Sequence, residues 1–237
     1  MSLAESRANN VPAMNDRKIR RGAWAALITS IAVVTVFAGI RVSQDVPAVV
    51  TGDLPPADSF ERRYADHPVL AYAHIIPGLV YLGIAPFQVS RRFRHGHLPR
   101  HRRLGRVALA AGIITGAFAI AIGLVFPYGG AIEASASVVF GIYFLASLAL
   151  AYRAIRQRRI DVHRRWMIRA FAVGTGVGTI RLVIGLSQAF GFEFDDVFGP
   201  AFWIAFVLHA VAAEAWLARY PTGPVSMLSH GSLRSDP

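Results

Sequence analysis

The chain contains no cysteine among its 237 residues, and only 16% of its residues are charged. The absence of cysteine excludes disulfide bonds, thiolate metal sites and cysteine nucleophiles. The sequence also has no phosphate-cradling glycine loop, nucleophile elbow or H-E-x-x-H motif, and no paired acids inside its apolar runs. A hydrolase or an ATP-driven pump is therefore not expected, and the sequence leaves open whether the protein is an enzyme.

Long apolar runs dominate the chain, whose mean hydropathy is +0.43. Six runs approach or exceed the roughly 20 residues that a helix needs to cross a bilayer. They are Gly22–Ile40, Pro68–Ser90, Val107–Ile132, Ala134–Tyr152, Ala170–Phe192 and Val197–Ala218. We therefore predict an all-α polytopic bundle. It would form a single six-helix transmembrane domain over residues 22–220, between a disordered basic N-terminus (1–21) and a disordered C-terminal tail (221–237).

The basic residues are unevenly distributed between the two sides of the predicted bundle. Lys and Arg number 21 in the termini and alternate loops but only 3 in the remaining loops, which are acidic. The positive-inside rule then places both termini in the cytoplasm of a bacterial inner membrane. The net charge of +11 is explained by this topology, so no nucleic acid partner is expected. The first run is either a signal peptide or an uncleaved anchor, and its length favours the anchor. The loop 41–66 is either a lid or a plain connector.

Two parts of the chain resemble each other when the sequence is aligned with itself at a shift of 62 residues. In this alignment His101-Arg102-Arg103 matches His163-Arg164-Arg165. Three glycines of the third run also match three of the fifth: Gly112, Gly116 and Gly123 match Gly174, Gly178 and Gly185. We predict a tandem parallel repeat of helices 2-3 and 4-5 about a pseudo-twofold axis. The glycine stripes favour tight helix packing. A flat wall for a planar cofactor is the alternative.

Four charged or histidine side chains lie inside the apolar runs, where they are costly and usually face the interior. His74 and His209 are candidate axial ligands of a haem iron, and Arg181 would then face a propionate. In the plainer interpretation, each histidine bonds to a neighbouring helix. We expect Glu214 to form an ion pair with Arg106 or Arg169.

The repeated triplets give a second candidate site, because His101 and His163 begin predicted helices, where the helix dipole favours anions. A lipid head group, a phosphate or a quinone oxygen would suit the neighbouring arginines, which are Arg102, Arg103, Arg164 and Arg165. The two histidines could also bind a second haem. The alternative is that these basic residues only fix the topology.

Several motifs together resemble an uncharacterised bacterial family of predicted integral membrane proteins. The motifs are Ala73-His74-Ile75-Ile76-Pro77-Gly78, Gln88, His101-Arg102-Arg103-Leu104-Gly105-Arg106, His163-Arg164-Arg165-Trp166-Met167-Ile168-Arg169 and Thr179-Ile180-Arg181. The family resemblance covers residues 68–220 and implies no established activity. The architecture alone is similar to the b561-type cytochromes, six-helix proteins whose four-helix core carries two bis-histidine haems. That likeness implies haem b, but helix 4 carries no histidine here.

Our leading hypothesis is an electron-transfer protein that binds b-type haem, contacts membrane lipids and interacts with quinone or a redox partner. The alternative is a carrier or binding protein for a small anion or lipid, without a redox cofactor. A structural or accessory subunit is the third interpretation. The sequence makes no prediction of oligomeric state.

Overall fold

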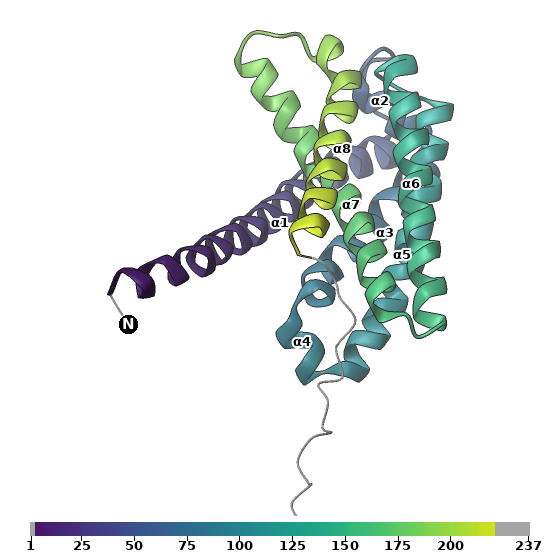
Figure 1. The fold of residues 1–237 in the computed structure, drawn as a ribbon. Helices are drawn as coiled ribbons and strands as arrows, with labels where there is room; N and C mark the ends of the chain where they lie inside the picture. Colours follow the sequence, from purple (N-terminus) through teal and green to yellow (C-terminus); the bar gives the residue numbers. More distant parts are fainter. Residues whose placement is uncertain (1–2, 221–237) are drawn as a thin grey trace, which may run out of the picture.

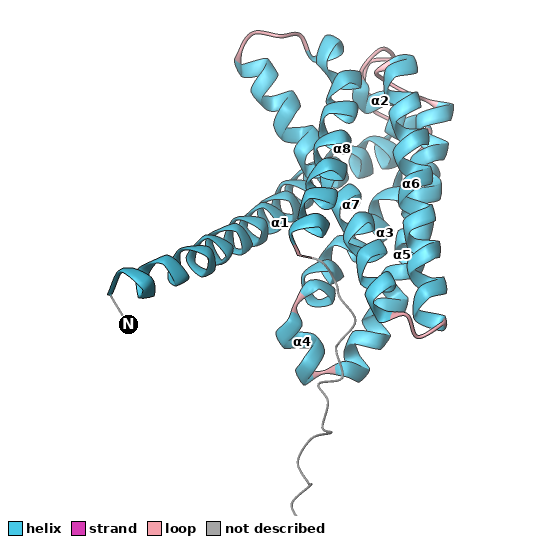
Figure 2. Cartoon of the chain, in the orientation of Figure 1, coloured by secondary structure: helices cyan, strands magenta, loops and turns pink. Residues whose placement is uncertain are grey.

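The computed structural model describes the backbone of residues 3–220 and the side chains of residues 16–220 except 49 and 91. This part of the chain is all helical, with no strand (Figures 1 and 2). The helices are α1 (Leu3–Thr51), α2 (Phe60–Asp66), α3 (Pro68–Val89), α4 (Arg91–Gly96), α5 (Leu98–Val125), α6 (Gly130–Arg156), α7 (Ile160–Ala189) and α8 (Phe194–Arg219).

Six of these helices are long and apolar enough to cross a membrane, which confirms the predicted fold class. They are α1, α3, α5, α6, α7 and α8, and their exposed faces are rich in Val, Leu, Ile and Phe that would contact lipid. The two short helices begin at serine caps. Ser59 Oγ accepts from the backbone N–H of Arg62 at 3.2 Å, and Ser90 Oγ accepts from that of Phe93 at 3.3 Å.

The first helix is longer than we predicted at both ends. It begins at Leu3, within the segment for which we expected disorder, and it continues past Ile40 to Thr51. Ion pairs stabilise both extensions: Asp16 pairs with Arg219 at 3.0 Å, and Arg41 pairs with Asp45 one turn along at 3.1 Å. The predicted loop 41–66 is therefore mostly helix, because α2 occupies its far end. The predicted disordered tail, 221–237, lies outside the described residues.

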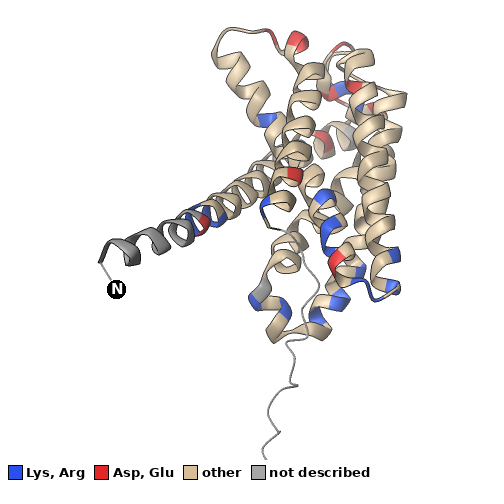
Figure 3. Ribbon diagram, in the orientation of Figure 1, with Lys and Arg blue, Asp and Glu red and all other residues tan. Residues whose placement is uncertain are grey.

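Helices α3, α5, α6 and α7 form the four-helix core. Each packs its backbone closely against two neighbours in the ring, whereas no Cα atoms of α5 and α7 lie within 8 Å of each other in the described structure, so these two helices lie diagonally. Helix α8 packs on α6 and α7, and α1 crosses α7 and α3 obliquely (Figure 1). Figure 3 shows that Lys and Arg gather where α4 lies, whereas acids gather near α2. We call these the basic end and the acidic end.

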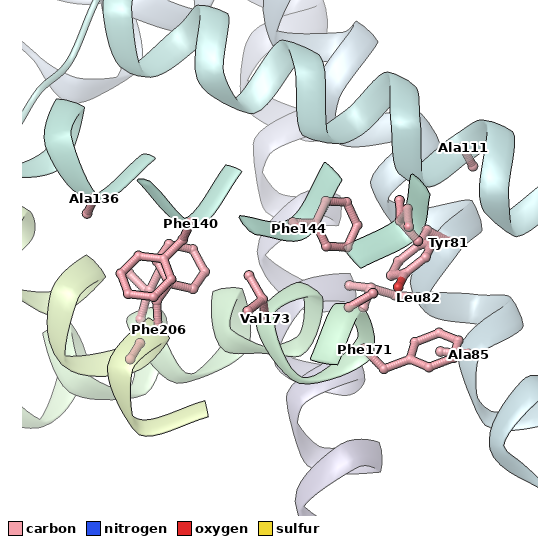
Figure 4. Close-up of a cluster of buried hydrophobic side chains, with 14 of the residues drawn as sticks. Tyr81, Leu82, Ala85, Ala111, Ala136, Phe140, Phe144, Phe171, Val173 and Phe206 are labelled. Atoms are coloured by element: carbon pink, nitrogen blue, oxygen red, sulfur yellow. The ribbon is translucent and has the colours of Figure 1, made fainter. Parts of the chain in front are cut away.

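The centre of the core is filled by aromatic side chains (Figure 4). Tyr81 is 1% exposed, and its ring lies 5.4 Å from the rings of both Phe144 and Phe171. A Cβ added at Gly112 or Gly174 would lie 3.1 or 2.9 Å from the Tyr81 ring, so both glycines let helices close on it. The glycine stripes thus serve tight packing.

The internal repeat is not confirmed. Gly112 and Gly174 both face Tyr81, as a pseudo-twofold axis would require, but another matched pair differs in its surroundings. A Cβ at Gly123 would lie 3.0 Å from the hydroxyl oxygen of Ser137, whereas a Cβ at Gly185 would meet nothing within 4 Å. The repeat stays a prediction.

Candidate functional site

His74 on α3 is oriented by α5. Its Nδ1 lies 2.9 Å from the backbone oxygen of Thr115, which can only accept, so Nδ1 carries the proton and Nε2 keeps its lone pair. The hydroxyl of Thr115 donates in turn to the backbone oxygen of His74 at 2.8 Å. This bond falls in the turn that Pro77 disrupts, where a neighbouring helix must satisfy freed carbonyl groups.

His209 on α8 is held differently. Its Nε2 lies 2.8 Å from the hydroxyl of Thr179, and its Nδ1 lies 3.3 Å from the hydroxyl of Thr175. Thr175 donates its own proton to the α7 backbone, so it can only accept from Nδ1, which must be protonated. The lone pair on Nε2 therefore accepts from Thr179 and is not available as a metal ligand in this arrangement.

The structure does not bring His74 and His209 together. Their helices, α3 and α8, make no contact within residues 3–220, and each imidazole bonds to the helix beside it. This arrangement matches the plainer interpretation of these two residues and does not favour one haem iron shared between them. Among the described residues, no group of three or more His, Asp and Glu is placed to hold a metal ion.

His101 and His163 lie together at the basic end, on the diagonal helices α5 and α7. The charge of His163 acts on His101, and Arg94 of α4 acts on both imidazoles. His163 Nδ1 lies 2.9 Å from the backbone oxygen of Ala151, so this imidazole also presents an unprotonated Nε2. His101 differs, because its Nδ1 is buried without a hydrogen-bond partner. Such an orphaned atom is unusual in a native core and calls for an explanation.

The arginines of the two triplets are arranged unequally around these histidines. Arg102 acts electrostatically on His101, and both Arg102 and Arg103 are exposed. Arg164 and Arg165 on α7 are partly buried, and Arg165 acts on Glu214. The basic end can therefore attract an anionic group to the surface beside the two imidazoles.

Arg181 lies toward the acidic end, beneath the short helix α2. Its guanidinium carbon is 5.6 Å from the ring centroid of Phe37, and the Tyr64 hydroxyl lies close enough to interact with its charge. Burial raises the pKa of that hydroxyl, although the neighbouring Arg181 opposes the shift. His74 and Glu133 also lie within electrostatic reach of Arg181. No carboxylate within the described residues forms an ion pair with it.

Sequence reasoning missed two polar side chains in this region. Glu133 lies between two apolar runs and was not expected inside a span, yet it is 6% exposed and accepts from the backbone N–H of Gly129 at 2.7 Å. Tyr64 belongs to a predicted loop. The i, i+4 spacing of apolar Phe60 and Tyr64 was the signal that could have identified α2.

Glu214 forms the expected ion pair, and its partner is Arg169. Two bonds of 2.6 and 2.9 Å join them in the bidentate geometry typical of guanidinium and carboxylate. Arg169 also lies 4.6 Å from the ring centroid of Trp166. Glu214 also lines a groove between α6 and α8.

The model of a known family matches more than half of the chain. The model of the family described as "Predicted membrane protein (DUF2306)" matches residues 71–222, which include the candidate histidines, Arg181 and Glu214 but not Tyr64. No curated protein and no solved structure matches the chain.

Proposed function

The chain belongs to DUF2306, a family of predicted membrane proteins, and we propose that this integral membrane protein binds b-type haem at its basic end and transfers electrons. The observation that supports this function best is the pair of His101 and His163 on diagonal helices. One imidazole presents an unprotonated Nε2, and the other carries a buried nitrogen without a partner. When bound between two axial ligands, haem supplies one-electron transfer between ferric and ferrous iron.

The surroundings of the pair suit such a group. Basic residues on three helices, Arg94, Arg102 and Arg164, lie on the elements that carry or adjoin the two histidines and would neutralise the propionates. Gln88 donates to the backbone oxygen of His101 at 3.3 Å and fixes the start of α5. We do not pair His74 with His209, because Thr179 already occupies Nε2 of His209. The orphaned nitrogen of His101 favours the basic-end pair.

The orientation in the membrane is part of this proposal. Because Lys and Arg gather at the basic end, that end would face the cytoplasm of a bacterial inner membrane. The proposed haem would then lie near the cytoplasmic surface, within reach of a soluble redox partner or of quinone in the bilayer.

The test is the dithionite-reduced minus oxidised absorbance spectrum of protein purified in mild detergent from a haem-sufficient bacterium. We expect a low-spin b-type spectrum with one haem per chain, and its loss in both His101→Ala and His163→Ala. The exposed His95 on α4 supplies the matched control. His95→Ala removes an imidazole at the same end of the bundle that is not one of the two proposed ligands, His101 and His163. A colourless wild-type protein, or a spectrum that survives both substitutions, would refute the proposal.

Arg181 supports a second candidate function, the binding of a small anion or an anionic lipid, because no carboxylate among the described residues forms an ion pair with its guanidinium. A charge inside a span is costly unless a partner compensates it, and a bound anion would be such a partner. In this case inorganic phosphate or phosphatidylglycerol should raise the thermal midpoint of the wild-type protein in detergent. The increase should disappear in Arg181→Gln, and no increase in the wild type would reject this function.

A further inference from the structure

A groove of about 560 Å³ runs between α6 and α8, within the size range of small-molecule sites. Toward the acidic end the two helices close tightly, because the ring of Phe140 lies 5.5 Å from that of Trp203 and 5.1 Å from that of Phe206. The groove begins where this contact ends. Its walls include Val139 and Val211, which are 48% and 61% exposed, so it opens onto the lipid-facing surface.

The end of the groove nearer the basic end is polar. Glu214 lines it with a side chain that is 52% exposed, and Arg169 holds that carboxylate through Nε and Nη2. The hydroxyl of Tyr143, another lining residue, lies close enough to Arg169 for the two groups to interact electrostatically. A carboxylate, a guanidinium and a phenol thus meet at the end of an otherwise apolar channel.

The charge at this end selects the kind of ligand. The carboxylate of Glu214 already neutralises Arg169, so an anionic head group would have to compete with it and would meet repulsion. A neutral carbonyl oxygen, in contrast, can accept from the Tyr143 hydroxyl without disturbing the ion pair. The aromatic wall of Phe140 and Tyr143 also suits a flat ring.

The depth of the polar end supports the same choice. Glu214 lies five residues before Arg219, the last residue of α8, which corresponds to about 7.5 Å along the helix axis. A phospholipid phosphate remains at the membrane surface, whereas the ring of a prenylated quinone is uncharged and can lie at this depth. Its isoprenoid tail would follow the apolar groove into the surrounding lipid.

We propose that the groove between α6 and α8 binds the ring of a prenylated quinone, with Tyr143 donating to a ring carbonyl beside the Arg169–Glu214 pair. The proposed electron-transfer function is needed only to explain where the electrons of a bound quinone go. Binding of the quinone itself does not require haem. His163, one of the two proposed ligands, lies on the same helix as Arg169 and six residues before it. The quinone ring would therefore lie in the same half of the bundle, along its axis, as the proposed haem.

The test uses a ubiquinone analogue with a short isoprenoid tail and a photoactivatable azido group on its ring. The analogue is irradiated with purified full-length protein in detergent, and the labelled peptides are mapped by mass spectrometry. We expect label on residues 139–143 and 210–215, and its displacement by excess unmodified quinone. Label spread over other helices, or equal displacement by excess phosphatidylglycerol, would overturn the assignment.

Three variants sharpen the test. Ala215→Phe fills the groove from an exposed position and should abolish the site-specific label, whereas Ala212→Phe adds the same ring to α8 outside the lining and should leave it unchanged. Tyr143→Phe keeps the ring but removes the donor, and it should weaken affinity about fivefold. Equal labelling of the two alanine variants, or unchanged affinity in Tyr143→Phe, would refute the proposed site.

The absorbance spectrum of the same samples separates this proposal from the haem assignment. A colourless protein that is labelled in the groove would refute haem and leave the quinone site intact. A haem spectrum that persists while the groove remains unlabelled would refute the quinone site alone.

Discussion

Replacing Gly178 by alanine should loosen the packing of α1 against the rest of the bundle. A Cβ at this position would lie 2.8 Å from both the Cα and the backbone oxygen of Ser30 on α1. Backbone atoms cannot rotate away as a side chain can, so the two helices must separate. The separation would also strain the bond from the Ser30 hydroxyl to the backbone oxygen of Thr175.

The expected cost follows from these two contacts. Overpacking of this kind costs about 1–3 kcal/mol, and the weakened hydrogen bond adds about 0.6 kcal/mol in a membrane protein. For a chain of this size, a loss of about 2–3 kcal/mol lowers the thermal midpoint by roughly 5–10 °C. The measurement is thermal unfolding in detergent followed by far-ultraviolet circular dichroism.

Gly185 supplies the matched control on the same helix, because a Cβ there would meet nothing within 4 Å. Gly185→Ala should leave the midpoint unchanged or raise it slightly, since alanine is the better helix former by about 1 kcal/mol. Equal midpoints for the wild type and Gly178→Ala would show that α1 does not pack on α7 in this way. Equal losses in both variants would show that the effect comes from α7 itself.

Two further predictions concern orientation and pH. The natural absence of cysteine allows single cysteines at Gln157 and Asp58 to be labelled in intact cells: a membrane-impermeant maleimide should react with the second only, and the reverse pattern would invert the proposed topology. The hydrogen bond to Asp195 raises the pKa of Tyr128 from 10.0 to about 12, so its contribution to stability is complete below pH 10 and lost as pH rises toward 12. The difference in thermal midpoint between wild type and Tyr128→Phe should therefore shrink over that range, and a constant difference would contradict this role of the hydrogen bond.

The sequence predicted the spans well because six apolar runs leave few alternatives to helices in a bilayer. It failed where polar residues are embedded in helix. Glu133 was assigned to the boundary between two runs, although Gly129 and the turn before α6 bury it. We predicted a loop over residues 41–66, yet α1 continues through Pro47 to Thr51. The Glu133 carboxylate is satisfied by a backbone N–H four residues earlier, and the helical backbone of α1 accommodates Pro47, and neither outcome can be seen in a pattern of hydropathy.

The histidines show more clearly what a single sequence cannot supply. Their position in apolar runs identified His74 and His209 as groups that face the interior, and the repeated triplet identified His163 at the start of a helix, but their chemistry depends on which atom of another residue lies beside each ring nitrogen. A backbone oxygen at Nδ1 leaves Nε2 of His74 and His163 with a lone pair, whereas a threonine hydroxyl occupies Nε2 of His209. Only the packed structure distinguishes these cases.

The difference between His163 and His209 therefore lies in their neighbours. Thr179, on the α7 turn opposite His209, satisfies the one nitrogen that a metal would need. No such hydroxyl contacts His163, whose only recorded hydrogen-bond partner is Ala151 within the described part of the chain. His209 is thus explained as a link between α7 and α8, and His163 retains an unused acceptor beside the orphaned nitrogen of His101. The free lone pair on Nε2 of His163 and the unsatisfied Nδ1 of His101 are the reasons why we propose the haem site at the basic end.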